Sequence, residues 1–260
     1  MLDALSPQRR RLVVVCIALA LLAVLTIAAG VFVRSTRTEP VEQGRPGPVL
    51  LVAGYGGRVE SLDPLVAELR AIGRTAVVVQ PVGGNTDDLQ LEAEHLGRVA
   101  DQVIDDTDAA SVDVVGYSAG GVVARLWVKE HGGVTRARRV LTLGSPQHGT
   151  SQAALGLELA GGCAAACEQL VPDSDLLRRL NAGDETPDGP LWATVRTNFD
   201  QVVTPVDSAA LAGALNLVVQ EVCPRSTAGH GDLPSDPVVR ESLITVLGAG
   251  YPSKPRSVSC

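Results

Sequence analysis

The fold of this 260-residue chain is decided by the stretch VDVVGYSAGG, residues 112–121. An apolar run passes here directly into a helical pattern through the motif G-x-S-x-G. A sharp turn from strand to helix holds the serine in a strained conformation, and small residues two positions to either side let the strand and the helix approach each other. Because the context fits on both sides, we interpret Ser118 as a nucleophile rather than as part of a structural Gly/Ser turn.

Short apolar runs alternate with longer helical patterns on both sides of this stretch. We expect strands at Val49–Ala53, Thr75–Gln80, Val112–Gly116, Arg139–Leu143, Trp192–Arg196 and Leu215–Glu221. We expect helices near Ser61–Ile72, Leu89–Asp105, Ala119–Glu130 and Asp236–Leu247. The alternation predicts an α/β fold with an open, doubly wound, mostly parallel sheet of about six strands and helices on both faces. Ligands of such sheets bind beyond the carboxyl ends of the strands.

A nucleophilic serine needs a base that a carboxylate orients, and after a turn of this type the chain order is serine, acid, histidine. The chain has four histidines. His95 and His131 lie in helical segments or at their ends, and His148 follows Ser118 too closely to leave room for the acid. His230 lies in a loop between the last predicted strand and the last predicted helix, so we predict that His230 is the base.

The acid should lie between the serine and the histidine in the sequence. Asp200 begins the turn after the strand Trp192–Arg196 and is the first candidate. Asp207 is the second, and Asp188 is the third because it precedes that strand. A carboxylate at position 200 would hold the imidazole of His230 in the correct tautomer and stabilise its protonated form. The alternative is that Asp200 only caps the following turn.

The oxyanion of a tetrahedral intermediate also needs two hydrogen-bond donors. One should be the backbone N–H of Ala119, the residue after the nucleophile, and the other should come from the loop after the first strand. That loop is AGYGG, residues 53–57, whose glycines let the backbone approach a substrate. We therefore predict Tyr55 N–H as the second donor, with a plain glycine turn as the alternative.

Five segments of the chain together carry a family resemblance. They are VAGYGG at 52–57, VDVVGYSAGG at 112–121, LGSPQHGT at 143–150, NFDQVV at 198–203 and GH at 229–230. In these segments the chain resembles the small secreted bacterial lipases and esterases of the α/β-hydrolase fold, of the minimal Bacillus and actinobacterial type. The matching triad positions are Ser118, Asp200 and His230, and the matching oxyanion positions are Tyr55 and Ala119.

Two positions depart from the pattern of these lipases. Ala53 stands where they usually have a histidine before the oxyanion glycine, and Tyr117 replaces the usual histidine beside the serine. Neither is a triad position. We therefore expect a changed pocket shape and unchanged chemistry.

These residues predict a serine carboxylic-ester hydrolase, a lipase or an esterase, that forms an acyl-enzyme with an ester or lipid substrate. The mechanism requires neither a cofactor nor a metal. The same machinery also serves acyl transfer, thioester cleavage and amide hydrolysis, and an inactive, membrane-tethered binding domain is a further alternative. A net charge of −7 without a Lys/Arg-rich run argues against binding of nucleic acid through its phosphates.

The N-terminus predicts an extracytoplasmic location. Three arginines at 9–11 precede an uncharged apolar run over residues 12–33, which is long enough to cross a membrane as a helix. The arginines should stay in the cytoplasm. Residues 1–33 are therefore expected to form a cytoplasmic stub and an uncleaved anchor. Cleavage as a signal segment at residues 28–30, which would release a secreted protein, is the alternative.

The rest of the chain is expected to divide into three parts. A turn-rich linker covers residues 34–48, the hydrolase domain covers residues 49–248, and a tail covers residues 249–260. An insertion at about 147–190 roofs the site in the resembled family. It is either an amphipathic cap that contacts lipid or a simple packing segment.

Four cysteines follow the predicted anchor, at positions 163, 167, 223 and 260. Disulfides persist outside the cytoplasm, and four cysteines allow three pairings. We favour Cys163 with Cys167 and Cys223 with Cys260. A metal site is disfavoured because no second Cys/His pair lies near the first two cysteines.

Overall fold

The computed structural model describes residues 8, 15–26, 41–256 and 258–260 of the chain. The chain divides into two units, Met1–Glu39 and Pro40–Cys260. Residues 15–26 of the first unit are helical. Among the residues that the structure describes, no helix combines the length and the apolar character needed to span a membrane. The predicted anchor over residues 12–33 and the linker over residues 34–48 lie partly outside the described residues, so both stay predictions.

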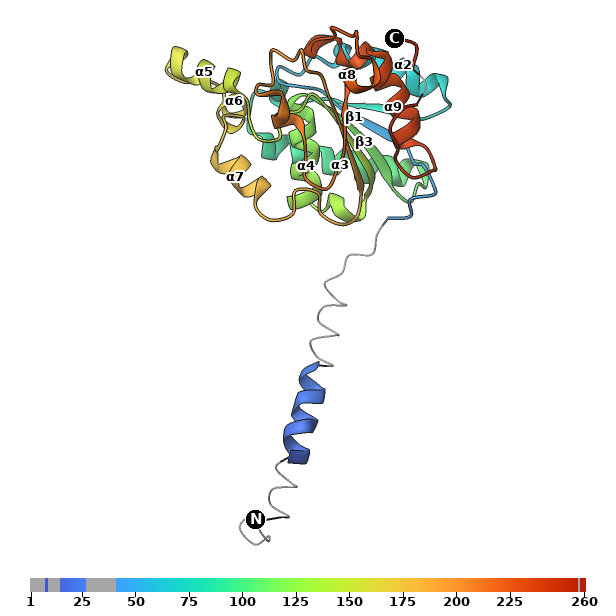
Figure 1. The fold of residues 1–260 in the computed structure, drawn as a ribbon, viewed down its shortest axis with the longest axis vertical. Coiled ribbons are helices and arrows are strands. Elements are labelled where there is room, and N and C mark those ends of the chain that lie inside the picture. Colours follow the sequence, from blue (N-terminus) through green and yellow to red (C-terminus); the bar gives the residue numbers. More distant parts are fainter. Residues whose placement is uncertain (1–7, 9–14, 27–40, 257) are drawn as a thin grey trace. The chain divides into compact units, whose positions relative to one another are not determined.

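The second unit is built around one sheet of parallel strands (Figure 1). The strands are β1 (Val49–Val52), β2 (Ala76–Val79), β3 (Val112–Tyr117), β4 (Ala137–Leu143), β5 (Leu191–Arg196) and β6 (Leu215–Val218). Their order across the sheet is β2-β1-β3-β4-β5-β6, and every neighbouring pair is parallel. The predicted fold class is confirmed. The order reverses between β1 and β3, the point at which such sheets bind ligands.

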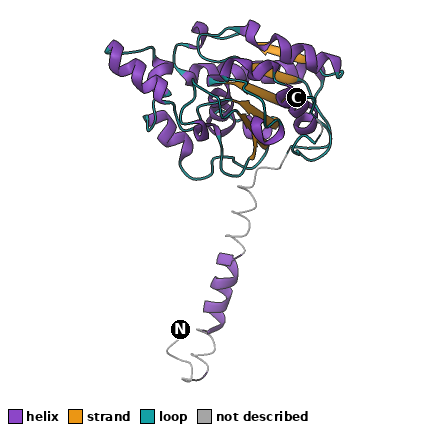
Figure 2. Ribbon diagram, turned by 45° about the horizontal axis from the view of Figure 1, so that its top comes forward, coloured by secondary structure: helices purple, strands orange, loops and turns teal. Residues whose placement is uncertain are grey.

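Helices cover both faces of the sheet (Figure 2). The α-helices of this unit are α2 (Asp63–Ala71), α3 (Leu89–Thr107), α4 (Ala119–Glu130), α5 (Ser151–Ala160), α6 (Ala165–Gln169), α7 (Asp175–Asn181), α8 (Val219–Val222) and α9 (Pro237–Leu247). Short 3-10 helices are η2 (Val59–Leu62), η3 (Gly83–Asn85), η4 (Gly133–Thr135), η5 (Val206–Ala209) and η6 (His230–Ser235). His230, which we expected in a loop, therefore begins η6.

Alternate residues of the strands enter two separate apolar cores. Leu50 and Val52 of β1 pack in the core that contains α3 and α4. Val49 and Leu51 pack in the core that contains α2 and α9. Because both faces of the central strands β1, β3 and β4 are covered, these strands read as nearly continuous apolar runs, which is why the sequence predicted their positions.

The last strand is shorter than the predicted strand Leu215–Glu221. It ends at Val218, which pairs with Arg196 at the end of β5. Beyond Arg196 the neighbouring strand offers no further pairing partner, and residues Val219–Val222 turn into α8 instead. The prediction was wrong over these last residues because apolar composition alone does not show where the partner strand stops.

Two cations join α7 to α4. Arg125 of α4 is only 1% exposed and donates to side-chain and backbone oxygens of Gln147, Leu180 and Asn181. Lys129, one turn later, donates to the carbonyl oxygens of Leu180, Ala182 and Asp184. These bonds cap the carboxyl end of α7 and hold the residues around it against the helix that follows Ser118.

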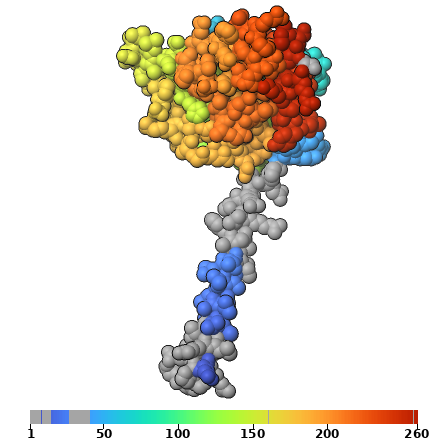
Figure 3. Space-filling model, in the orientation of Figure 1, coloured from blue at the N-terminus to red at the C-terminus, as the bar shows by residue number. Residues whose placement is uncertain are grey.

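Helices α5 to α7 occupy the region where the insertion at about 147–190 was expected. In the space-filling view, α5 projects from one end of the unit (Figure 3). Its Leu155 and Leu159 side chains are exposed. Cys163, in the segment after α5, forms a disulfide with Cys167 of α6.

A buried charged cluster lies at the amino ends of β3 and β4. Asp113 is fully buried and accepts hydrogen bonds from Arg138 at 2.9 and 2.5 Å and from Arg74 at 2.6 Å. Arg138 and its neighbour Arg139 also donate to carbonyl oxygens at the end of α9 and just beyond it, those of Val246, Leu247, Gly248 and Gly250. The cluster also holds the chain before β1, because Arg138 donates to Gln43 O at 2.9 Å.

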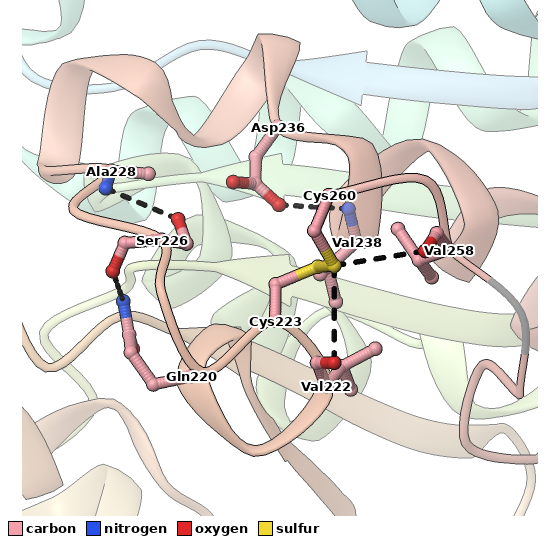
Figure 4. Close-up of a disulfide and its surroundings, with 9 residues drawn as sticks. All are labelled: Gln220, Val222, Cys223, Ser226, Ala228, Asp236, Val238, Val258 and Cys260. Carbon is pink, nitrogen blue, oxygen red and sulfur yellow. Dashed lines mark hydrogen bonds between the residues drawn. A yellow bond between two sulfur atoms is a disulfide. The ribbon is translucent and has the colours of Figure 1, made fainter.

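The chain terminus is fastened by a second disulfide, between Cys223 and Cys260 (Figure 4). Cys223 directly follows α8 and is 2% exposed. Figure 4 shows that Gln220, Ser226 and Ala228, from the segment that leads to His230, lie near this bridge. The structure thus has both of the pairings that we favoured.

Candidate active site

Ser118 lies in the tight turn between β3 and α4. Its backbone has φ 55° and ψ −127°, a conformation that residues with a side chain rarely adopt. The Ser118 N–H donates to Leu143 O at 2.8 Å, which ties the turn to β4. Small residues are required around it, because a Cβ on Gly116 would lie 2.5 Å from Gly121 Cα and one on Gly120 would lie 2.3 Å from Val52 O.

Three side chains from distant parts of the chain form a hydrogen-bonded series at the carboxyl ends of the strands. His230 Nε2 lies 3.1 Å from Ser118 Oγ, and His230 Nδ1 lies 2.8 Å from Asp200 Oδ2. A carboxylate can only accept, so Nδ1 carries the proton and Nε2 accepts the serine hydroxyl. The side chains of His230 and Asp200 are 10% and 2% exposed. The series is therefore largely shielded from water and has the polarity needed to remove a proton from Ser118.

Asp200 uses its two carboxylate oxygens for two different purposes. Oδ2 accepts from His230, whereas Oδ1 accepts the backbone N–H groups of Val202 and Val203, each at 2.8 Å. Capping of the turn and orientation of the histidine, which the sequence presented as alternatives, are thus combined in one side chain.

The other candidates lie outside this series. The Asp207 side chain is 80% exposed and pairs with Arg196, and Asp188 is exposed. His131 contacts Gln90, and His148 contacts Glu185 at 2.7 Å. Among the described residues, His230 is the histidine that contacts Ser118.

Gln220 and Thr197 join the segments that carry Asp200 and His230. Gln220 Nε2 donates to Thr197 Oγ1 at 2.9 Å and to Ser226 O at 3.2 Å, and Thr197 Oγ1 donates to Ala228 O at 2.6 Å. Sequence reasoning missed both residues. Thr197 lies just after β5 and Gln220 lies just after β6, and these positions were the only signal that could have indicated the two residues.

The loop after β1 lies directly against Ser118. A Cβ on Gly54 would come within 2.8 Å of Ser118 Cβ, so only glycine fits there. Tyr55 follows in this loop, and Ala119 is the first residue of α4. Within residues 41–256, neither the Tyr55 N–H nor the Ala119 N–H donates to another backbone or side-chain group, which leaves both amides available to a ligand.

Asn85 holds this loop in place. It is 2% exposed, and its Nδ2 donates to Ala53 O at 2.9 Å and to Gly54 O at 3.0 Å. Glu92 of α3 is 3% exposed, and burial raises the pKa of its carboxyl. Sequence reasoning missed Asn85, since nothing in its local sequence indicates a contact with the loop after β1.

Comparison with known proteins shows which family the chain resembles in sequence. The sequence pattern of the palmitoyl protein thioesterase family matches residues 48–181. This chain belongs to that family. The match includes the Ser118 turn and the loop after β1 and ends before Asp200 and His230. No curated protein matches the chain by sequence.

Solved structures share the fold of this thioesterase-family chain. Aspergillus fumigatus lipase B matches with a TM-score of 0.70 and 18% identity, over 83% of this chain and 56% of the lipase. The mature form of Bacillus licheniformis lipase BlEst2 matches with a TM-score of 0.65 and 17% identity, over 82% of this chain and 95% of the lipase. The chain thus spans little more than half the length of the Aspergillus lipase. The expected likeness to lipases and esterases of the α/β-hydrolase fold is confirmed, and family and fold together support a hydrolase.

Proposed function

We propose that this chain is a serine carboxylic-ester hydrolase with Ser118 as nucleophile, His230 as general base and Asp200 as the carboxylate that orients it. The observation that carries the proposal is the hydrogen-bonded series from Asp200 through His230 to Ser118. The strained backbone of Ser118, which points a serine out of a turn at the ligand-binding edge of the sheet, supports it further.

The reaction would proceed through an acyl-enzyme. Ser118 Oγ attacks the carbonyl carbon of the substrate while His230 Nε2 takes the hydroxyl proton. The imidazolium then returns this proton to the leaving group, and the acyl group stays on Ser118. Water attacks the acyl-enzyme with His230 again as the base, which releases the carboxylic acid and restores the serine.

The oxyanion of each tetrahedral intermediate would be held by the backbone N–H groups of Tyr55 and Ala119. Both amides lack an acceptor within residues 41–256, and the Gly54 loop lies against Ser118. Ala119 also begins α4, so the positive end of the helix dipole adds to the stabilisation of negative charge near Ser118.

A second candidate is cleavage of an acyl thioester, which the family match favours. The same serine chemistry serves both bonds, because only the leaving atom differs. Butyryl and palmitoyl substrates, each supplied as an oxygen ester and as a thioester with the same leaving-group skeleton, separate the two candidates. A kcat/KM higher for the thioesters at both chain lengths would favour the thioesterase.

We also propose that the hydrolase unit works outside the cytoplasm, tethered through its N-terminal segment. The two disulfides support an oxidising compartment, since such bonds are rare in the reducing cytosol.

The test of the serine hydrolase is the Ser118→Ala variant. We expect turnover of p-nitrophenyl butyrate to fall by at least about 10³-fold and labelling by a fluorophosphonate probe to disappear, because the attacking oxygen is gone. Ser61→Ala, which changes a half-buried serine outside the hydrogen-bonded series, is the matched control and should leave both signals unchanged. Labelling of Ser118→Ala at the wild-type rate would exclude the assignment, and an unlabelled wild type would indicate an inactive binding domain.

A further inference from the structure

Tyr117 ends β3 immediately before Ser118, and its ring stacks on the imidazole of His230. The two ring centroids lie 5.2 Å apart, and the ring planes make an angle of 30°. The Tyr117 hydroxyl also donates to the His230 carbonyl oxygen at 3.2 Å. One side chain thus contacts both the ring and the backbone of the proposed base.

The surroundings of Tyr117 hold its ring in place. The residue is 9% exposed and belongs to the apolar core that also contains Leu143 and Leu233. Burial raises the pKa of the Tyr117 phenol to about 12, and the nearby carboxylates of Asp200 and Asp232 add to the effect. The phenol therefore stays neutral at physiological pH and keeps its proton for the bond to the His230 carbonyl.

We propose that Tyr117 is a positioning residue that stabilises His230 as an imidazolium during catalysis, an inference that rests on the proposed serine hydrolase function. A cation within about 6 Å of an aromatic centroid is attracted by the negative face of the ring. Neutral imidazole gains much less from this contact. The stacking therefore favours the state that His230 reaches once it has taken the Ser118 proton, and an interaction that strengthens on the way to the transition state raises kcat.

This role changes the meaning of one departure from the lipase pattern. Tyr117 stands where the resembled lipases usually have a histidine, and the sequence suggested that this would alter only the shape of the pocket. The stacking indicates instead that the tyrosine at this position acts on the proposed base, His230. A second histidine at this position would be open to protonation beside the imidazolium, whereas the Tyr117 phenol stays neutral.

The test compares the full-length wild type with Tyr117→Phe, which keeps the ring, and Tyr117→Leu, which removes it. Each protein is titrated with a fluorophosphonate probe, whose phosphorus forms a bond to Ser118 Oγ as fluoride leaves and His230 takes the proton. The titration gives the number of reactive sites, and its time course gives the rate per site. Steady-state turnover of p-nitrophenyl butyrate gives kcat and KM separately.

We expect Tyr117→Leu to label at every site but about 5- to 30-fold more slowly, with kcat reduced to match and KM unchanged. Tyr117→Phe should stay within about threefold of the wild type, because it keeps the aromatic face. Trp192→Leu replaces another buried aromatic side chain, which lies in the core on the opposite face of the sheet. This variant is the control for lost packing. Its rate per site should remain that of the wild type.

The outcomes distinguish this inference from the proposed function. If the wild type is labelled and Tyr117→Leu reacts at the wild-type rate per site, Tyr117 has no positioning role, although the hydrolase assignment stands. The same conclusion follows if Tyr117→Leu loses reactive sites while the remaining sites keep the normal rate, since that is a folding defect. An unlabelled wild type overturns both the positioning role of Tyr117 and the proposed hydrolase function.

Discussion

Gly144 follows β4 with a φ of +52° and lies against the paired side chains of Asp200 and His230. A Cβ at this position would lie 3.1 Å from His230 Nδ1, 3.2 Å from Asp200 Oδ2 and 2.7 Å from a methyl group of Leu233. We expect Gly144→Ala to reduce kcat/KM by about 10²-fold or more, because small displacements of catalytic groups are costly. Steady-state kinetics of the purified variant measure the loss.

The control for this prediction is Gly73→Ala. Gly73 has a φ of +76°, but no atom lies within 4 Å of its missing Cβ. The two substitutions therefore impose comparable backbone strain of about 1–3 kcal/mol, and only the one at position 144 collides with the pair. Equal losses of activity in both variants would mean that strain, and not the collision, is responsible.

The grouping of candidate site residues was predictable where chemistry restricts their order in the chain. Ser118, Asp200 and His230 follow the order serine, acid, histidine, and the structure brings the three together. Gly144 and Asn85 were not predictable in their roles. Each acts through contacts with segments far away in the sequence, and one sequence carries no signal for such contacts.

Helix α7 depends on Arg125, which within residues 41–256 donates hydrogen bonds to amide and carbonyl oxygens and to no carboxylate. Burial lowers the pKa of Arg125 to about 10, so its guanidinium is still charged at neutral pH. We expect Arg125→Met to lower the free energy of unfolding by about 2–3 kcal/mol, because buried oxygens of Gln147, Leu180 and Asn181 lose their donor. Urea denaturation measures the change.

Arg179→Met is the matched control for this helix. Arg179 pairs with Glu130 at 3.2 Å on the exposed surface, where an ion pair contributes less than about 1 kcal/mol. A loss in Arg125→Met no larger than that in Arg179→Met would contradict the buried role.

Elements were predictable from sequence where a buried face gives a clear apolar pattern. The central strands and α4 are covered on all sides, and their apolar runs marked them within a few residues. The end of β6 was misplaced, since pairing decides it. The three helices at residues 151–181 were expected only as an insertion, because Ala- and Gly-rich segments have no clear apolar period.

At the scale of the whole unit, the Cys223–Cys260 disulfide joins two positions that are 37 residues apart in sequence. Joining positions so far apart removes chain entropy from the unfolded state, which gives about 4 kcal/mol of stabilisation. The double variant Cys223→Ser, Cys260→Ser should therefore lose about this much free energy of unfolding in urea. The Cys163–Cys167 bridge, with a separation of four, should contribute only about 2 kcal/mol.

Comparison of the two double variants tests the chain-entropy explanation. A larger loss from the short bridge than from the long one would show that loop length does not set the stabilisation.

At the scale of the whole molecule, the sequence predicted the fold class and the cysteine pairs, whereas the cluster around Asp113 was unforeseen. Arg138 and Arg139 lie at the start of β4 and Arg74 lies just before β2, and the sequence there indicates neither their burial nor their partners.

The Asp113 cluster has a practical consequence for handling the molecule. It clamps Gln43, just ahead of β1, at the amino ends of the strands, whereas Ser118 follows the carboxyl end of β3. The six residues of β3 separate these two edges by about 20 Å. A fusion partner or a solid support attached ahead of residue 41 would therefore hold the protein by the edge away from the proposed nucleophile, and the immobilised protein would present Ser118 to the surrounding solution.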